Sequence, residues 1–336
     1  MKKLLVFLLL IFSFSLFYSC RGETVRASGD ATRGGVYLLC GFDDAAENTD
    51  VLILFGYDAT ENATTAIQIP RDTYYRAGTA QNKINSLYAF YRSRGHGKEE
   101  SLSLLKNEIA TLFDIRIDGA VGLGTSALRR CVDLVGGVTL RVPHDLVTVG
   151  ADGEQRVLLT AGEHTLNGEE AETFVRYREG YALGDIGRVD AQKLFLSAFF
   201  RKARESVGAD TLLGLLRVMR EEVVTDISLT DAAGLLLRNY SKFKDTAMRY
   251  VTLPGQSARG TSGVWYYVAN RKGVSEVAER YLFSGGSIDR GGRLTAEDEI
   301  AIDNVYHDDG LTYRVYGEEE LSDLSVAEKR PERKSP

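Results

Sequence analysis

The sequence predicts an α/β fold in which a mixed central sheet carries helices on both faces, forming an α/β/α sandwich. Strand-like and helix-like hydrophobic patterns alternate along one stretch of roughly 250 residues, which neither a repeat nor a linker interrupts. The chain has 336 residues, 44% of them hydrophobic and 26% charged, which is an ordinary globular composition. A wholly disordered chain and a collagen-like chain are therefore excluded.

Three strands are predicted at the start of this domain. Residues 35–41 and 64–69 are compact apolar runs, and the run at 50–57 is so continuous that its strand is expected to be buried on both faces. Turn residues at 58–62 connect the second strand to the third. Because short connections favour antiparallel neighbours, the loop at 42–49 and the end of the third strand are expected at one edge of the sheet.

Helices and further strands follow. An apolar helical stripe begins near Glu99, and another over residues 124–135 stops at Gly136-Gly137, as helices commonly do at glycine. Asn167 is the expected N-cap of a later helix, with Glu170 as its capping-box partner. The other predicted elements are strands at 138–142, 146–149, 156–160 and 248–253, with a hairpin turn at Asp152-Gly153, and helices at 187–206, 209–222, 229–241 and 273–283.

Four segments are predicted along the chain: a signal or membrane anchor at 1–20, a linker at 21–34, the α/β domain at 35–286 and an acidic, disordered tail at 287–336. Lys2 and Lys3 precede an apolar run, which is how export signals are built. Two alternatives follow, an uncleaved anchor or a lipoprotein signal with Cys20 as its acylated first residue. Either one tethers the domain to the extracytoplasmic face of the cell membrane, and a fully released secreted protein is the third alternative.

Charge and cysteine content exclude several classes of function. With 41 basic and 47 acidic residues, a net charge of −6, the chain offers no general affinity for nucleic acid. Three cysteines and four histidines without paired spacing argue against a disulfide framework and a thiolate zinc site. Cys40 and Cys131 lie in apolar stretches, so we expect two buried free thiols rather than a disulfide.

Two carboxylates and an arginine are expected to meet at the sheet edge described above. Asp43 follows the first strand, Asp50 begins the second and Arg71 follows the third. This set suits a hard cation together with a phosphate group. The alternative is that Asp43 and Asp44 cap the loop and that Asp50 is a solvated strand start.

A second cluster of arginines lies between two predicted helices. Arg176 and Arg178 share a face only on extended backbone, so they point together if the first of these helices has ended. Arg188 falls in the first turn of the next helix, where backbone amides favour anions. Guanidinium groups bind phosphate oxygens in pairs, so the cluster suits a diphosphate. The alternative is that these are surface arginines paired with the nearby glutamates Glu169, Glu170 and Glu179.

A series of short motifs occurs in this order: Gly41-Phe-Asp43, Thr49-Asp50, Gln68-Ile-Pro-Arg71-Asp72-Thr73-Tyr74, Lys83-Ile-Asn85-Ser-Leu-Tyr88, Gly136-Gly137-Val138, Val175-Arg176-Tyr177-Arg178 and Asp185-x-Gly-Arg188-x-x-x-Gln192. Together they resemble the LytR-CpsA-Psr (LCP) family of cell-envelope phosphotransferases. The third motif followed closely by the fourth is the most specific part of the resemblance. It implies an α/β/α sandwich of the LCP type, anchored in the membrane by its N-terminus.

The resemblance also implies an activity. Such enzymes move a glycopolymer from a polyprenyl-pyrophosphate carrier to a peptidoglycan hydroxyl as a phosphodiester, with Mg²⁺ as the cofactor. By position, Asp43 and Asp50 would hold Mg²⁺, and Asp50 would help to deprotonate the acceptor. The residues implied to bind the pyrophosphate are Arg71, Arg176, Arg178, Arg188 and Gln192, with Lys83 either near the headgroup or merely packed. The catalytic set implied is Asp50, Arg71, Arg176 and Arg178, and pyrophosphatase side activity is a further expectation.

The carrier lipid requires an apolar slot. One predicted helix is unusually apolar and could line it, although core packing is the alternative role for its side chains. They are Leu194, Phe195, Leu196, Ala198, Phe199 and Phe200.

Two positions depart from the family pattern. Asn48 and Ala191 stand where the family usually has arginine. Arg76, Arg92 and Arg94 are the candidates to compensate. The departures leave two other functions open, a non-catalytic sensor or scaffold that binds polyprenyl pyrophosphate, and a lipid pyrophosphate hydrolase with water as the acceptor.

Overall fold

The computed structural model describes residues 33–43, 48–76, 78, 82–179, 181, 185–206, 209–228, 245–283 and 313–322. The chain forms two compact units. The sheet unit holds the described residues up to Gly124 together with those of Val223–Val315. The helical unit holds Thr125–Glu222 and the described residues from Tyr316 onward.

Four predicted features lie outside the described residues: the signal or anchor with Cys20, the linker before residue 33, the helix at 229–241 and most of the acidic tail. In the part of the chain that the structure describes, no helix is both long and apolar enough to cross a membrane. The limits 35–286 of the α/β domain stay a prediction.

The sheet unit is built on a mixed sheet. Within this unit its strands follow the order β10-β3-β2-β1-β4-β9. β1 and β3 each run antiparallel to β2, as their short connections predict. β9 runs antiparallel to β4. The two parallel pairs are β4 with β1 and β10 with β3. The strands are β1 (Arg33–Phe42), β2 (Thr49–Asp58), β3 (Ala63–Ile69), β4 (Gly119–Leu123), β9 (Val223–Thr225) and β10 (Ala247–Thr252).

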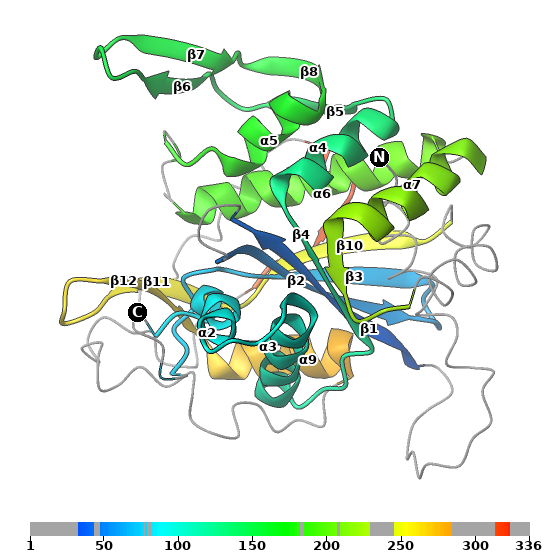
Figure 1. The fold of residues 1–336 in the computed structure, drawn as a ribbon, viewed down its shortest axis with the longest axis vertical. Coiled ribbons are helices and arrows are strands. Elements are labelled where there is room, and N and C mark those ends of the chain that lie inside the picture. The colour runs from blue at the N-terminus through cyan, green and yellow to red at the C-terminus, as the bar shows by residue number, and fades with distance from the viewer. Residues whose placement is uncertain are drawn as a thin grey trace. The chain divides into compact units, whose positions relative to one another are not determined.

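Three helices cover one face of this sheet (Figure 1): α2 (Leu87–Ser93), α3 (Lys98–Phe113) and α9 (Arg271–Leu282). Their apolar side chains form one buried core with those of the strands. Residues 52–57 of β2 are all buried, so that strand is covered on both faces, as its continuous apolar run predicts. The prediction of an α/β fold with a mixed sheet flanked by helices is confirmed.

A small hairpin and a short helix complete the sheet unit. β11 (Gly255–Arg259) and β12 (Trp265–Ala269) pair antiparallel, and the 3-10 helix η2 (Ile84–Ser86) precedes α2. The ring of Tyr266 in β12 packs edge-on against Tyr74, with centroids 5.3 Å apart. This packing fastens the hairpin to the stretch of chain that follows β3.

Among the described residues, the helical unit packs four helices together with two small two-stranded sheets (Figure 1). β5 pairs with β8, and β6 pairs with β7 around the predicted turn at Asp152-Gly153, where Gly153 has φ = 78°. The elements are α4 (Thr125–Leu134), β5 (Val138–Val142), β6 (Leu146–Val149), β7 (Gln155–Leu159), β8 (Gly162–Leu166), α5 (Gly168–Arg176), α6 (Asp185–Ser206) and α7 (Ala209–Glu222).

Local signals set the ends of these helices as predicted. The Asn167 side chain accepts hydrogen bonds from the backbone N–H groups of Glu169 and Glu170, and the Glu170 carboxylate accepts one from the Asn167 N–H, which completes the capping box. α4 ends before Gly136 and Gly137, whose φ angles of 82° and 87° favour glycine.

The last described residues return to the helical unit. They form β13 (Tyr316–Gly317) and the 3-10 helix η4 (Glu320–Ser322), which contacts α6. Lys193 Nζ lies 4.9 Å from the centroid of the Tyr316 ring, and Arg204 forms an ion pair with Glu318. Leu321 is 1% exposed. The predicted acidic tail therefore contains a segment that packs on α6.

The two described cysteines are buried free thiols, as predicted. Burial raises the pKa of the Cys40 thiol well above its ordinary value, and the nearby carboxylate of Asp226 raises it further. The thiolate is the reactive form of cysteine, so Cys40 is an unreactive core residue.

Several short elements were not predicted, and each has a physical reason. β4 contains Gly119 and Gly122, which disfavour strands, yet a side chain at either would collide with Ile227 or Phe42. α2 is rich in aromatic residues, which have modest helix propensity. β9, β11 and β12 span at most five residues each, too few to establish an alternating pattern.

We predict that Gly56→Ala destabilises the protein by at least about 1–3 kcal/mol, because a Cβ atom there would lie 1.9 Å from the Tyr281 backbone oxygen in α9. Chemical denaturation measures this change. Gly97→Ala is the control, since a Cβ at Gly97 meets no atom within 4 Å. Equal stability of the two variants would contradict the close approach of α9 to β2.

Candidate functional site

Asp50 occupies a β-bulge at the edge of the sheet. Gly41 pairs with Val51 and Phe42 pairs with Thr49, so Asp50 is the extra residue of β2 at this point. A bulge bends the strand and changes the direction of the side chain that it carries. The bulge therefore gives the Asp50 side chain a direction that a regular strand would not give it.

Arg71 and Asp50 form an ion pair, with Arg71 Nη1 2.7 Å from Asp50 Oδ1. Their side chains are 18% and 19% exposed, so both are largely shielded from water. The turn after β3 places Arg71, because Thr73 donates from both its backbone N–H and its hydroxyl to the Pro70 carbonyl. The expected meeting of these two residues at one edge is therefore present, and Asp50 is not merely a solvated strand start.

Asp43 lies at the same end of the β1–β2 hairpin. Its backbone N–H donates to the Asn48 carbonyl over 2.9 Å, which closes the loop between the strands. The ring of Phe42, just before it, packs against Tyr88 with centroids 4.4 Å apart. Among the described residues, no group of three or more His, Cys, Asp or Glu side chains is placed to bind a metal.

Asn85 is fastened beside the ion pair by its backbone. Its carbonyl accepts a hydrogen bond from the Thr49 hydroxyl at 3.2 Å, and its N–H donates to the Arg71 carbonyl at 3.3 Å. The residue is 9% exposed, and no described residue lies within hydrogen-bonding distance of its Oδ1 atom. A buried amide oxygen of this kind is costly unless a partner satisfies it.

Lys83 contacts an aspartate and a tyrosine ring in the sheet unit. Its Nζ atom lies 2.8 Å from Asp72 Oδ1 and 5.7 Å from the centroid of the Tyr266 ring. The lysine side chain is 15% exposed. These contacts hold the Lys-Ile-Asn stretch against the turn that carries Arg71.

The second arginine cluster begins where α5 ends. Arg176 is the last residue of α5, and Tyr177 has an extended backbone with ψ = 134°. Arg176 and Arg178 are exposed whereas Tyr177 between them is buried. This alternation is what extended backbone produces after the helix, although Arg176 itself is still the last helical residue, so a shared face for the two arginines stays a prediction.

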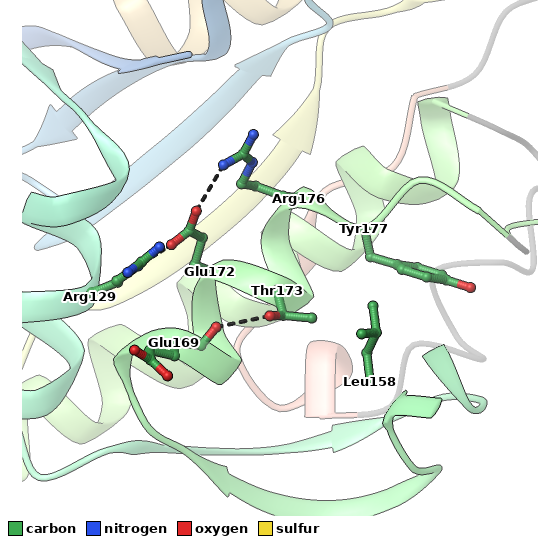
Figure 2. A pocket seen from close by; sticks show the side chains of 7 residues that line it. All are labelled: Arg129, Leu158, Glu169, Glu172, Thr173, Arg176 and Tyr177. Atoms are coloured by element: carbon green, nitrogen blue, oxygen red, sulfur yellow. Dashed lines mark hydrogen bonds and ion pairs between the residues drawn. The ribbon is translucent and has the colours of Figure 1, made fainter. Parts of the chain in front are cut away.

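A buried carboxylate holds Arg176. Figure 2 shows Glu172 between Arg129 and Arg176, bonded to Arg129 through Oε2 and to Arg176 through Oε1, the latter at 2.8 Å. The Glu172 side chain is 8% exposed, against 46% and 52% for the two arginines. Gly168 makes the arrangement possible, since a Cβ there would lie 2.5 Å from the Arg129 carbonyl oxygen. α5 can thus start directly against α4.

The pKa of Glu172 reflects two opposing influences. Burial alone would raise it, but hydrogen bonds and charge from Arg129 and Arg176 outweigh burial and hold the pKa below the ordinary value of 4.5. Glu172 is therefore ionised at neutral pH and fixes one edge of each guanidinium group.

Arg188 and Gln192 lie on α6. Arg188 is in the first turn, as predicted, and is only 1% exposed. Gln192 donates from Nε2 to the Val175 carbonyl at 3.1 Å, which ties α6 to the residue before Arg176. Arg188, Gln192 and the end of α5 therefore belong to one packed region of the helical unit.

An open hollow of about 440 Å³ adjoins α5 in the helical unit (Figure 2). Helices α4 and α5 give it charged groups, while β7 and the residue after α5 give it Leu158 and Tyr177. The Tyr177 hydroxyl is fixed by hydrogen bonds with the backbone N–H and carbonyl of Val147, both at 3.1 Å. The hollow thus has one polar wall and one apolar wall.

The predicted site residues are divided between the two units. Asp43, Asp50, Arg71 and Lys83 belong to the sheet unit, and the other members belong to the helical unit. Their roles stay predictions. The helical-unit members are Arg176, Arg178, Arg188 and Gln192.

Glu172 was not predicted as a partner of Arg176, although a spacing of four residues on a helix is a recognised pairing signal. Arg176 forms an ion pair with Glu172, a glutamate that was not among those considered for it. Glu170 instead completes the cap of α5. Arg129, on another helix, carried no such signal.

The candidate compensating arginines have local neighbours. Arg92 donates from Nη1 to the His96 carbonyl at 2.5 Å, and the Arg94 guanidinium lies 4.3 Å from the centroid of the Phe90 ring. Arg76 is exposed. Ala191 is fully buried, so the position that usually holds arginine is part of the packed interior here. The apolar side chains of α6 from Leu194 to Phe200 are likewise buried, as core packing requires.

Comparisons with known proteins agree with the motif pattern. A sequence model of the LytR_cpsA_psr family matches residues 23–281. The polyisoprenyl-teichoic acid–peptidoglycan teichoic acid transferase TagU of Oceanobacillus iheyensis is 26% identical over 244 residues, or 71% of this chain and 72% of that protein. The transferase TagV of Bacillus subtilis is 28% identical over 71% of this chain and 62% of its own length.

A solved structure shows the same fold. The structure of TagT bound to LIIa-WTA superposes with a TM-score of 0.60 at 26% identity, covering 79% of this chain and 98% of that one. The similarity thus extends over nearly the whole of that structure.

We predict that Glu172→Gln lowers the unfolding free energy by about 1–3 kcal/mol at pH 7, because two guanidinium groups lose their shared anion. A pKa below 4.5 in the folded state means that this contribution is complete above pH 4.5 and is lost as pH falls through the folded value. Denaturation at pH 7 and pH 3 measures it. The difference between variant and wild type should shrink at the lower pH.

The matched control is Glu163→Gln, an exposed glutamate of the same unit, which should stay within about 0.5 kcal/mol of wild type at both pH values. A Glu172→Gln difference that does not depend on pH would contradict the ion-paired state of the carboxylate.

Proposed function

We propose that this chain, which belongs to the LytR_cpsA_psr family, is an extracytoplasmic phosphotransferase. Its substrate would be a glycopolymer carried on polyprenyl pyrophosphate, and its acceptor a hydroxyl of peptidoglycan. The observation that carries the proposal is the match of the family over residues 23–281, together with relatives named as teichoic acid–peptidoglycan transferases.

The reaction exchanges one phosphorus–oxygen bond for another. The acceptor hydroxyl attacks the phosphorus that bears the glycopolymer, and the bridging bond of the pyrophosphate breaks. Polyprenyl phosphate leaves with the electron pair of that bond, and the hydroxyl proton passes to a base. We assign the base to Asp50, the carboxylate on the bulge at the sheet edge.

Arg71 and Asp50 support each other in this scheme. A guanidinium group has five N–H donors, so Arg71 can bind phosphate oxygens while Nη1 stays on Asp50. A carboxylate paired with arginine is a weak base, because the neighbouring cation stabilises its ionised form. A phosphate bound to Arg71 would offset the positive charge of the guanidinium group, and this would make Asp50 more basic when substrate is bound.

The arginines of the helical unit are assigned to the pyrophosphate. Arg176 and Arg178 are exposed at and just after the end of α5, and Arg176 is held by Glu172. Arg188 stands in the first turn of α6, where the helix dipole also favours an anion. With Gln192 and Lys83 they complete the proposed binding set. Preorganised cations of this kind stabilise the charge that develops on phosphorus oxygens.

The residues at the sheet edge fit Mg²⁺. Asp43 and Asp50 offer carboxylate oxygens, and Asn85 beside them has a buried amide oxygen without a hydrogen-bonding partner among the described residues. Mg²⁺ prefers oxygen ligands and is commonly bound through one or two carboxylates plus phosphate oxygens of the substrate. When bound, the ion would neutralise phosphate charge and orient the reacting phosphorus.

The cellular setting is part of the same proposal. The basic and then apolar N-terminal sequence supports export with a membrane tether, which would bring the domain to a lipid-borne substrate. Asn48 and Ala191 stand where the family usually has arginine. Binding of the substrate alone would therefore not establish the activity, and catalysis has to be measured directly.

We predict that Arg71→Ala lowers Mg²⁺-dependent release of polyprenyl phosphate by about 10²- to 10³-fold, because it removes phosphate-binding donors and leaves Asp50 without its arginine. The control is Arg259→Ala, an exposed arginine of β11, which should stay within about twofold. Undiminished release after Arg71→Ala would refute its role. Tight binding of substrate without turnover by wild type would identify a sensor or scaffold instead, and release to water alone would identify a hydrolase.

We predict that Asp43→Asn raises the Mg²⁺ concentration needed for half-maximal release by at least about tenfold. Electron paramagnetic resonance of bound Mn²⁺ measures the same loss without turnover. Asp58→Asn at the far end of β2 is the control, since its side chain accepts hydrogen bonds from the turn at Thr60 and Glu61 and asparagine can do the same. Metal affinity equal to wild type in Asp43→Asn would remove Asp43 from the site.

A further inference from the structure

The open hollow beside α5 is defined by residues from three parts of the helical unit. Arg129 comes from α4, and Glu169, Glu172 and Arg176 come from α5. Leu158 of β7 lines the same hollow, near Thr173 and Tyr177 (Figure 2). Of these residues, only Arg176 has a part in the proposed transfer.

The charges of the lining balance. Two guanidinium groups face two carboxylates, so the hollow has no net charge. Glu172 is buried and bonded to both arginines, so its charge offsets theirs inside the hollow. This balance disfavours a polyanion and favours an uncharged ligand that can use many donors and acceptors at once.

The opposite wall is apolar. Leu158 is 45% exposed although it is a large hydrophobic residue. Tyr177 is 7% exposed, and its hydroxyl is already bonded to the backbone of Val147, so the ring rather than the hydroxyl is what Tyr177 offers to the hollow. An apolar surface facing a row of polar groups suits a ligand that is itself apolar on one side and polar at its edge.

A sugar ring has this combination, since the C–H groups of its face are apolar and hydroxyl and amide groups surround its edge. We propose that the hollow binds a saccharide of the acceptor glycan, a chain of N-acetylated amino sugars. This inference rests on the proposed function, because Arg176 belongs both to the hollow and to the proposed pyrophosphate set.

The dimensions agree with this ligand. A volume of about 440 Å³ lies in the range of small-molecule sites. The hollow is open rather than enclosed, and a site for one unit of a polymer must be open for the rest of the chain to continue. The acceptor would thus be held next to the arginine that grips the donor, which is the arrangement that transfer requires.

The test compares two adjacent residues of β7. Leu158 lines the hollow and Val157 does not, yet both are exposed, at 45% and 55%. Titration of the full chain with a β-1,4-linked N-acetylglucosamine tetrasaccharide gives the affinity of each variant. Leu158→Ser should weaken binding about five- to tenfold through lost apolar contact, and Val157→Ser should stay within about twofold of wild type.

A kinetic measurement separates acceptor from donor. Leu158→Ser should raise KM for a peptidoglycan acceptor by a similar factor and leave KM for the polyprenyl-pyrophosphate donor unchanged. No binding of the tetrasaccharide by wild type, or equal weakening in both serine variants, overturns the inference. If wild type releases no polyprenyl phosphate but binds the tetrasaccharide through Leu158, the transferase proposal fails and the saccharide site stands.

Discussion

The ion pair between Arg71 and Asp50 is the interaction on which the sheet edge depends. It joins a turn after β3 to a bulge at the start of β2, and the backbone of Asn85 is fastened to both. Both charges are largely shielded from water, so neither would be tolerated well without the other. The pair therefore fixes the place where the ends of three strands and the Lys-Ile-Asn stretch meet.

The helical unit also pairs a carboxylate with arginine. There one carboxylate, Glu172, serves two arginines, and it is the carboxylate that is buried while the cations extend outwards. A long side chain anchored at one edge loses less freedom when an anion binds at the other. In each unit, an acidic residue thus fixes the position of an arginine.

Much of this arrangement could be predicted from the sequence. Continuous apolar runs gave β1 to β3, short connections gave their antiparallel pairing, and that pairing placed Arg71 near Asp50. The capping box at Asn167 and the hairpin at Asp152-Gly153 were correct because both signals are local. The bulge at Asp50 could not be predicted, because a one-residue shift in pairing is decided between strands. β4 was missed for a related reason, since its glycines fit neighbouring side chains rather than a strand pattern.

The segment from Tyr316 to Ser322 has a consequence for how the chain matures. α6 is covered by residues that lie more than a hundred positions later, with Leu321 buried and Arg204 bonded to Glu318. A polypeptide exported with its N-terminus leading would deliver the strands of the sheet first and these residues last. The helix that carries Arg188 and Gln192 would then stay incompletely covered until residues 316–322 have emerged, so its final packing would form late.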